Sequence, residues 1–294
     1  MKLYLLAALL TTLTFSQTLN ETLANRIKGF DGKVTLYAKN LDTGATVGIA
    51  ESEPVRTAST IKLPIMAATF DAVARGKAKW TELLTVTAAE KVSGSGVIGS
   101  ELSDGIQLPL RDVLHLMIVL SDNTATNMIL ERITADSVNA YLDKIGLKTT
   151  RSMRKVRGDG NQLKSPSGWS GAGKLPENQK YGLGVSSPRD MVTLLEKLEN
   201  GELVSREASQ EMLAILKRCH DDSGIRRRIG NLKVANKTGS LDALRSDVGI
   251  VYAPTGRIAL AITVDGMPKI DYTPDNLGSQ LIADLASLIV EGLR

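Results

Sequence analysis

The chain has 294 residues, 43% of them apolar and 23% charged, a composition typical of a soluble globular protein with a substantial core. Its 36 basic and 32 acidic side chains give a net charge of +4 and are scattered along the sequence, apart from the run Arg226–Arg228. Six Tyr, three Phe and two Trp form no ladder interleaved with basic residues. This argues against a nucleic-acid partner, and a solvated face better explains the arginine run.

The first 16 residues have the layout of a secretory signal peptide. A positive start precedes residues 3–15, which are largely apolar and uncharged. Thr14 and Ser16 then place small side chains at −3 and −1 of a cleavage site before Gln17. The apolar stretch is too short to span a bilayer, and the alternative is an ordinary apolar N-terminal helix. We therefore expect a protein exported to the periplasm or secreted, without a membrane span, whose mature chain begins at Gln17.

Both ends of the mature chain contain strand patterns. Leu19, Leu23 and Ile27 indicate a short amphipathic helix, and a hairpin follows with strands over residues 34–38 and 46–50. Near the other end a closing helix is expected over residues 277–288. Three strands are predicted before it, at Lys233–Ser240, Val248–Ala253 and Arg257–Val264.

The middle of the chain has mostly helical patterns. The expected helices are Pro109–Leu120, Asn123–Ile133, Asp136–Ile145, Pro188–Glu199 and Arg206–Arg218. The clearest start is at Ser187, an N-cap residue that is followed by Pro188 at the first helical position and Asp190 at the third. Residues 158–182, rich in Gly, are expected to form a long loop.

Together these patterns predict an α/β (α+β sandwich) fold. A mainly antiparallel sheet is built from both termini and flanked by helices, with an inserted all-helical lobe. We expect one catalytic domain over residues 17–294. Its sheet lobe would comprise about 17–58 and 221–294, its helical lobe would comprise about 59–220, and the site would lie in the cleft between them.

The first candidate motif is Ser59-Thr60-Ile61-Lys62. At the start of a helix, residues three apart share a face, so Lys62 would lie one turn beyond Ser59 and within reach of its hydroxyl. A lysine whose pKa is lowered by burial or by a nearby cation can accept the serine proton. The spacing is weak evidence by itself, because it recurs at Ser152 and Lys155.

Two further motifs follow along the chain. Ser121-Asp122-Asn123 lies at the junction of two predicted helices, where its residues could equally be ordinary helix caps. Lys237-Thr238-Gly239-Ser240, written here as Lys237–Ser240, lies on a predicted strand and could equally be a strand that ends in turn-like residues. Each motif alone is a weak signal.

The three motifs together, in this order and at these separations, resemble those of class A β-lactamases and penicillin-binding proteins. The resemblance covers essentially the whole mature chain, Leu19 to Arg294. It implies that Ser59 is the nucleophile and Lys62 its base or proton relay. Ser121 would pass the proton to the departing ring nitrogen.

The resemblance also implies substrate-binding residues. Asn123 would hold the side-chain amide of the substrate, and Lys237 would supply positive charge to the substrate carboxylate and help lower the pKa of Lys62. If the preceding turn is one residue shorter, Arg245 falls where many members carry a carboxylate-binding Arg. A surface arginine is the alternative.

The strand segment of the third motif would lie along the substrate. Thr238, Gly239 and Ser240 form this segment, and the backbone N–H groups of Ser59 and Ser240 would form an oxyanion hole. Such a donor contributes about 3–4 kcal/mol in a well-studied case.

One position departs from the family pattern. Class A enzymes carry a glutamate two residues beyond an Arg, and it activates the water that releases the acyl group. Here Arg154 is followed by Val156, which cannot polarise water. Glu177, in the long loop, is the single glutamate between residues 151 and 190 and could replace the missing base. An exposed loop carboxylate is the alternative.

The sequence therefore supports an exported serine hydrolase that opens β-lactam rings through an acyl-enzyme on Ser59. The alternatives are a D,D-peptidase or esterase of the same fold and a penicillin-binding or sensing module that does not turn over. Val156 favours the alternatives, whereas the expected lack of an anchor and of a second domain disfavours cell-wall synthesis and signalling. We expect a monomer that takes a small β-lactam or related acyl substrate and needs no cofactor or metal.

Overall fold

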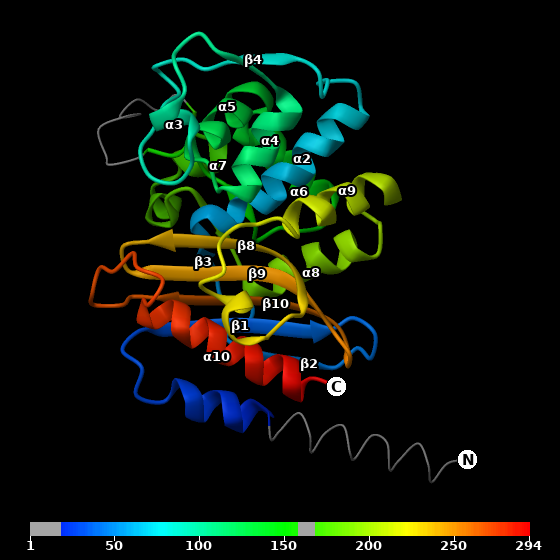
Figure 1. Cartoon of the computed structure of the whole chain (residues 1–294), viewed down its shortest axis with the longest axis vertical. Coiled ribbons are helices and arrows are strands. Elements are labelled where there is room, and N and C mark those ends of the chain that lie inside the picture. The colour runs from blue at the N-terminus through cyan, green and yellow to red at the C-terminus, as the bar shows by residue number, and fades with distance from the viewer. Residues whose placement is uncertain (1–18, 158–167) are drawn as a thin grey trace.

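The two ends of the chain meet in one antiparallel sheet. The computed structural model describes residues 19–157 and 168–294, so the expected signal segment lies outside the described residues. Across the five-stranded sheet the order is β2 (Thr46–Ile49), β1 (Lys33–Asn40), β10 (Gly256–Asp265), β9 (Leu244–Ala253) and β8 (Lys233–Leu241) (Figure 1). The N-terminal hairpin is thus joined to three C-terminal strands, as the strand patterns predicted.

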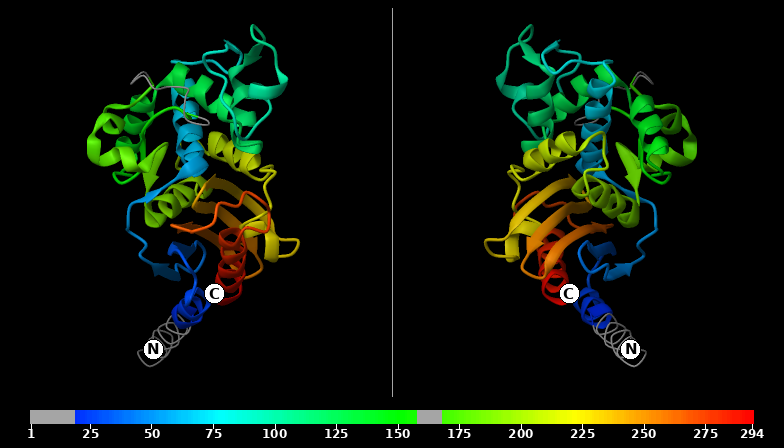
Figure 2. Two further views of the ribbon diagram at one scale, coloured as in Figure 1. Left: turned by 90° about the vertical axis from the view of Figure 1, so that its left-hand side faces the viewer. Right: turned by 90° about the vertical axis from the view of Figure 1, so that its right-hand side faces the viewer.

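Both faces of the sheet are covered, because alternate residues of each strand enter different cores. On β1, Leu36 packs with α10 (Leu277–Gly292) and the helix over residues 19–27, whereas Tyr37 belongs to the larger core beneath the other helices. The two side views place the sheet between these two groups of helices (Figure 2).

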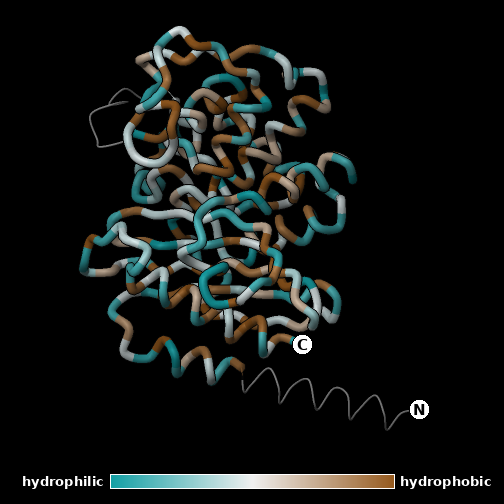
Figure 3. Tube along the Cα trace, viewed as in Figure 1, coloured by the Kyte–Doolittle hydropathy of each residue, from teal (hydrophilic) through white to brown (hydrophobic). Residues whose placement is uncertain are grey.

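The second part of the molecule is mainly helical. Its α-helices are α2 (Lys62–Ala74), α3 (Ile98–Glu101), α4 (Leu110–Val119), α5 (Asn123–Ile133), α6 (Ala135–Lys144), α7 (Gly171–Lys174), α8 (Pro188–Glu199) and α9 (Arg206–Leu216). Helix α2 is central, since every residue from Lys62 to Asp71 is buried. Hydrophobic residues recur along these helices (Figure 3).

The predicted helices and strands agree with the structure to within a few residues at most boundaries, and the fold class is confirmed. At the start of α8, Ser187 accepts a hydrogen bond from the Asp190 backbone N–H at 3.1 Å. The carboxylate of Asp190 in turn accepts from the backbone N–H groups of Thr149 and Thr150, at 3.1 Å each. Asp190 therefore links the start of α8 to the segment that contains Thr149 and Thr150.

The helical part also contains short strands that the sequence did not predict. One small sheet joins β3 (Val55–Arg56), β7 (Gly184–Ser186) and β6 (Arg151–Ser152), and β4 (Leu83–Thr85) pairs with β5 (Gln107–Pro109). Strands of two or three residues are too short to show alternation, so no pattern marked them.

Within the described residues, no helix is both long and apolar enough to cross a membrane.

The buried side chain of Asn40 connects the C-terminal end of the chain to the N-terminal hairpin of β1 and β2. Asn40 is fully buried, and its Nδ2 donates to the backbone carbonyls of Thr255 (3.1 Å) and Leu293 (3.0 Å). Its Oδ1 accepts from the backbone N–H groups of Asp42 and Thr43 in the turn. One side chain thus satisfies four backbone groups.

Asn40→Asp isolates the Nδ2 contribution, since the acceptor for the turn is kept while the two donors are replaced by an oxygen facing carbonyls. We expect the free energy of unfolding to fall by roughly 2–3 kcal/mol, the cost of buried carbonyls without donors. Urea unfolding measures the change, and Asn231→Asp, at an exposed position, is the matched control. Equal stability of the two variants would contradict this role for Asn40.

Candidate active site

Ser59 lies in a short turn at the entrance to α2. The turn is the 3-10 helix η1 (Ala58–Ile61), so Ser59 precedes the α-helix that begins at Lys62. Ser59 is half-buried, and Ala58 before it has a φ of 47°. A left-handed conformation costs about 1–2 kcal/mol in a residue with a Cβ, so the surrounding packing must hold this turn.

That packing comes from β8, which presses against η1 at Gly239. A Cβ on Gly239 would lie 2.9 Å from the Thr57 carbonyl oxygen and 3.0 Å from the Ser59 backbone nitrogen. Only glycine allows this approach. The contact brings the Lys237–Ser240 segment beside the Ser59 backbone N–H, and the side chain of Ser240 is exposed at the end of the segment. The first and third motifs are thereby adjacent.

Lys62 joins the first motif to the second. Its side chain is fully buried, and its Nζ lies 2.6 Å from the Ser121 carbonyl oxygen, 3.1 Å from Ser121 Oγ and 2.9 Å from Asn123 Oδ1. Burial and then the charge of Lys237 lower the pKa of Lys62 well below its ordinary value, against a smaller opposing effect of Asp122. Its amine is therefore able to act as a base.

The middle residue of the second motif organises the neighbouring loop. Asp122 is fully buried and caps α5 by accepting from the Ala125 N–H at 2.8 Å. It also accepts from the backbone N–H groups of Val97 (2.7 Å) and Ile98 (2.9 Å). The capping that the residue types suggested is present, and Asp122 additionally fixes the loop that precedes α3.

Lys237 is fully buried on β8. Its Nζ donates to the Thr238 carbonyl oxygen at 2.9 Å. Burial lowers the pKa of Lys237, whereas Cys219, Asp221 and Asp247 oppose this shift. The charge of Lys237 contributes to the lowered pKa of Lys62.

Arg245 is buried, with 4% of its surface exposed, and is therefore not a surface arginine. Its Nη1 donates to the carbonyl oxygens of Leu241 and Leu244, both at 2.6 Å, and its Nη2 donates to that of Asp271. The guanidinium also lies 4.9 Å from the centre of the Tyr272 ring. Arg245 stands opposite Ser240 in the pairing of β8 with β9, but its donors serve the protein backbone.

The backbone at Val156 is clamped against α5. Its N–H donates to Asn127 Oδ1 at 2.7 Å, and its carbonyl accepts from Asn127 Nδ2 at 3.1 Å. Asn127 lies one helical turn beyond Asn123, so Val156 is held beside the helix that carries the Lys62 partner. Sequence reasoning missed Asn127, because an Asn inside a helix carries no signal for a partner 29 residues away.

The second Ser-x-x-Lys pair has a structural role. Lys155 is buried, and its Nζ lies 3.0 Å from a carboxylate oxygen of Glu90 and also pairs with Glu131. Ser152 is buried as well, and its hydroxyl has no hydrogen-bond partner in the described part of the chain. Lys155, through its two ion pairs, therefore anchors the segment before Val156.

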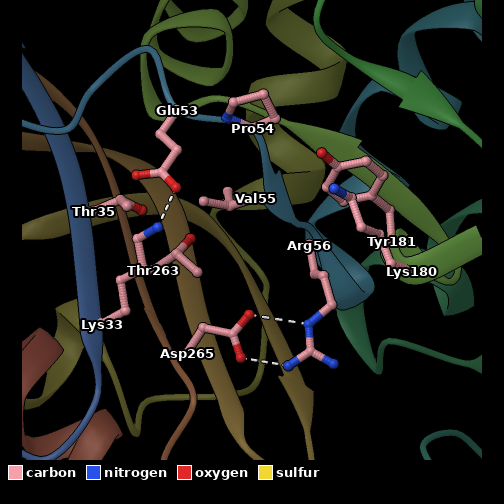
Figure 4. A pocket seen from close by; sticks show the side chains of 10 residues that line it. All are labelled: Lys33, Thr35, Glu53, Pro54, Val55, Arg56, Lys180, Tyr181, Thr263 and Asp265. Carbon is pink, nitrogen blue, oxygen red and sulfur yellow. Dashed lines mark hydrogen bonds and ion pairs between the residues drawn. The ribbon is translucent and has the colours of Figure 1, made fainter. Parts of the chain in front are cut away.

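Glu177 is not brought to this cluster by any contact of the described residues. It is exposed on the 3-10 helix η2 (Pro176–Tyr181), which packs near β3. The end of η2 lines a separate cavity of about 390 Å³ in which Arg56 pairs with Asp265 and Lys33 with Glu53 (Figure 4). No residue of the three motifs lines this cavity.

Within the described ranges, no group of three or more His, Cys, Asp or Glu side chains could hold a metal ion.

Comparison with known proteins shows the family of the chain. The model of the beta-lactamase enzyme family matches residues 17–293, so the chain belongs to that family. A β-lactamase from Sphaerobacter thermophilus is 28% identical with a TM-score of 0.78, over 93% of this chain and 95% of the other. A PBP-A point mutant, solved as an acyl-enzyme with penicillin G, is 28% identical with a TM-score of 0.77, over 95% and 96%.

A curated relative carries a regulatory name. The beta-lactamase regulatory protein BlaB of Streptomyces cacaoi is 25% identical over 291 residues, which cover 88% of this chain and 92% of BlaB. The family and fold are thus shared by proteins named as hydrolases, as penicillin-binding proteins and as regulators.

The electrostatic link between the two buried lysines predicts a pH effect. If neutral Lys62 takes the serine proton, the acylation rate rises with pH through the lowered pKa of Lys62. The charge of Lys237 contributes to that lowering, so Lys237→Met should raise the pKa of Lys62 and move the acid limb of the profile to higher pH.

The measurement is the acylation rate by a chromogenic β-lactam from pH 5 to pH 10. Lys233→Met removes a charge from the exposed start of the same strand and should leave the limb in place. If the acid limb of the pH–rate profile of Lys237→Met stays at the wild-type pH, whatever the absolute rate, then Lys62 is not the titrating base.

Proposed function

We propose that this protein reacts with β-lactams at Ser59, opening the ring and forming an acyl-enzyme that hydrolyses slowly. The observation that carries the proposal is the fully buried Lys62, whose Nζ contacts Ser121 and Asn123 one turn from Ser59. A buried amine with a lowered pKa, in contact with the Ser121 hydroxyl and three residues beyond the half-buried Ser59, is suited to moving a proton during acyl transfer.

In the proposed acylation, Ser59 Oγ attacks the lactam carbonyl while its proton moves to Lys62 Nζ. The developing oxyanion is stabilised by the backbone N–H groups of Ser59 and Ser240. When the C–N bond breaks, the ring nitrogen takes the proton of the Ser121 hydroxyl, which recovers one from Lys62. The product is an ester on Ser59 with an opened ring, and Lys62 is neutral again.

The release of the acyl group requires a water molecule and a base. Val156 offers neither acid nor base at the position that Asn127 holds beside α5. General base catalysis typically contributes about 10²–10⁴-fold, so hydrolysis should be slow relative to acylation.

This same observation favours a second candidate function, a sensor or trap that remains acylated. The regulatory name of the BlaB relative and the acyl-enzyme captured for a PBP-A mutant support this candidate. The two functions differ only in the lifetime of the ester.

Incubation with benzylpenicillin distinguishes these functions when ring opening and the intact mass of the protein are followed together. We expect a burst of ring opening equal to the amount of protein, a mass increase by one acyl group, and then slow turnover. Rapid turnover without a burst would contradict slow release, and a burst with no later turnover would establish the trap.

Ser59→Ala should abolish this covalent labelling, because it removes the attacking oxygen. The matched control is Ser152→Ala, which changes the other Ser-x-x-Lys pair at a hydroxyl without a hydrogen-bond partner among the described residues. Labelling is measured by intact mass after incubation with excess penicillin. Persistent stoichiometric labelling of Ser59→Ala would refute the nucleophile assignment.

Val156→Glu should shorten the life of the acyl-enzyme by about 10²-fold or more, since it adds a carboxylate at a backbone position already held by Asn127. Val156→Gln has the same shape without the base and should leave the lifetime long. Decay of the acylated mass after removal of free penicillin measures both.

A different carboxylate could supply the base in the wild-type protein. If Glu177 does so, Glu177→Gln should lengthen the lifetime of the acyl-enzyme relative to wild type without slowing its formation.

A further inference from the structure

The end of the β8–β9 hairpin, residues 240–245, stands at the edge of the main sheet. A turn of two residues joins its strands between Leu241 and Leu244. Within the described part of the chain, the outer strand β8 has β9 as its only neighbour in the sheet. Ser240 follows Gly239, which lies against the turn that carries Ser59. The position of the Ser240 backbone N–H, an expected oxyanion donor, therefore depends on what holds this hairpin end.

Arg245 links the two strands of the hairpin end. Its Nη1 has two hydrogens and donates to the carbonyl oxygens of Leu241 and Leu244, both at 2.6 Å. One of these carbonyls lies on each side of the turn. Only 4% of the Arg245 surface is exposed, so the link is shielded from water. Ser240 pairs with Arg245 and precedes Leu241, so a change in this guanidinium also shifts the Ser240 N–H.

The loop between β10 and α10, residues 266–276, holds the same hairpin end from outside. Arg245 Nη2 donates to the Asp271 carbonyl, and the guanidinium lies 4.9 Å from the centre of the Tyr272 ring. The Tyr272 hydroxyl donates to Asp242 Oδ1 in the turn at 2.7 Å. In Figure 1 this loop lies at the end of the sheet towards which β8 points. The loop thus binds both the turn and the arginine between the strands.

The loop is itself anchored to the rest of the protein. The Met267 N–H donates to the carbonyl oxygen of Ala243, the second residue of the turn, at 3.1 Å. Arg227, which lies before β8, donates to the Pro274 carbonyl and forms an ion pair with Asp275 at 2.5 Å. The loop is therefore a fixed support for the hairpin end.

We propose that Arg245 is a positioning residue for the oxyanion hole, which holds the Ser240 backbone N–H in place through the hairpin end, and not a receptor for a substrate carboxylate. The inference rests on the proposed acylation of Ser59. A guanidinium that receives a carboxylate favours the substrate that carries one. A guanidinium that positions an oxyanion donor acts on the reacting carbonyl, which every lactam has, and serves charged and uncharged substrates equally.

The test separates charge from shape at position 245. Arg245→Lys keeps the charge without the planar fork, and Arg245→Met loses both. Acylation by benzylpenicillin and by its methyl ester is followed by intact mass over a range of lactam concentrations. We expect both variants to lower the limiting rate about tenfold or more for acid and ester alike, because loss of one oxyanion donor costs about 10²–10³-fold and displacement costs part of that. The ratio of the acid rate to the ester rate should stay within about twofold of wild type.

An infrared measurement distinguishes positioning from a loss of stability. Hydrogen bonds in the oxyanion hole polarise the ester carbonyl of the acyl-enzyme, so its stretching band should move to higher wavenumber in both Arg245 variants. Partial unfolding reduces the amount of acyl-enzyme, but it does not move the band of the molecules that remain folded.

Tyr272→Phe is a milder second variant. Tyr272 is 62% exposed, and the change removes only the hydroxyl that binds Asp242. We expect acylation by both lactams to slow by about two- to fivefold, the range of one hydrogen bond, with a band shift in the same direction.

Arg151→Lys is the matched control. Arg151 Nη1 also donates to two backbone carbonyls, those of Leu147 (3.1 Å) and Thr150 (2.8 Å), in another part of the fold. This variant should keep the wild-type rates and the wild-type band, because it leaves the hairpin end intact.

The outcomes separate the inference from the proposed function. A rate loss confined to the acid, or an unmoved band in the folded Arg245 variants, overturns the positioning role while acylation of Ser59 stands. If the Arg245 variants do not fold, Tyr272→Phe decides, and wild-type rates with an unmoved band overturn the inference. If neither lactam labels wild type, the proposed function fails and the inference fails with it.

Discussion

The burial of the Lys62 amine is the constraint on which the rest of the site depends. An amine removed from water needs acceptors, and here they are the Ser121 carbonyl and the Asn123 side chain, at 2.6 and 2.9 Å. Both lie at the start of α5, so α2 and α5 must keep a fixed relation to each other. Asp122 contributes to this by capping α5 and binding the adjacent loop. The same burial that makes these acceptors necessary also lowers the pKa of Lys62, together with the charge of Lys237.

The sheet imposes the second constraint from the opposite side. Strand β8 forms one edge of the sheet, and its Gly239 touches the turn that carries Ser59. The left-handed backbone at Ala58 is maintained by this contact and by the buried helix that follows. Ser59 therefore lies where the C-terminal strands meet the helical part, and its position requires both ends of the sequence to be folded.

Much of this arrangement could be predicted from the sequence, because long periodic segments and three motifs in order carry strong signals. The helices α5 and α8 were placed at their observed ends. Features that depend on distant partners could not be predicted. Nothing local marks Asn127 as the hydrogen-bond partner of the Val156 backbone. Strand β9 also begins earlier than its apolar run at Val248, because buried Asp247 is satisfied by Asn236 across the strands.

The clamp on Val156 has an evolutionary consequence. The hydrogen bonds between Asn127 and Val156 use only the N–H and the carbonyl of Val156, which every residue type except proline provides. The side chain at this position can therefore be exchanged by single mutations without loosening the segment. Related chains can therefore differ in the chemistry of this side chain while their architecture is conserved. Under the proposed acylation, slow and fast release of the acyl group are then separated by few substitutions.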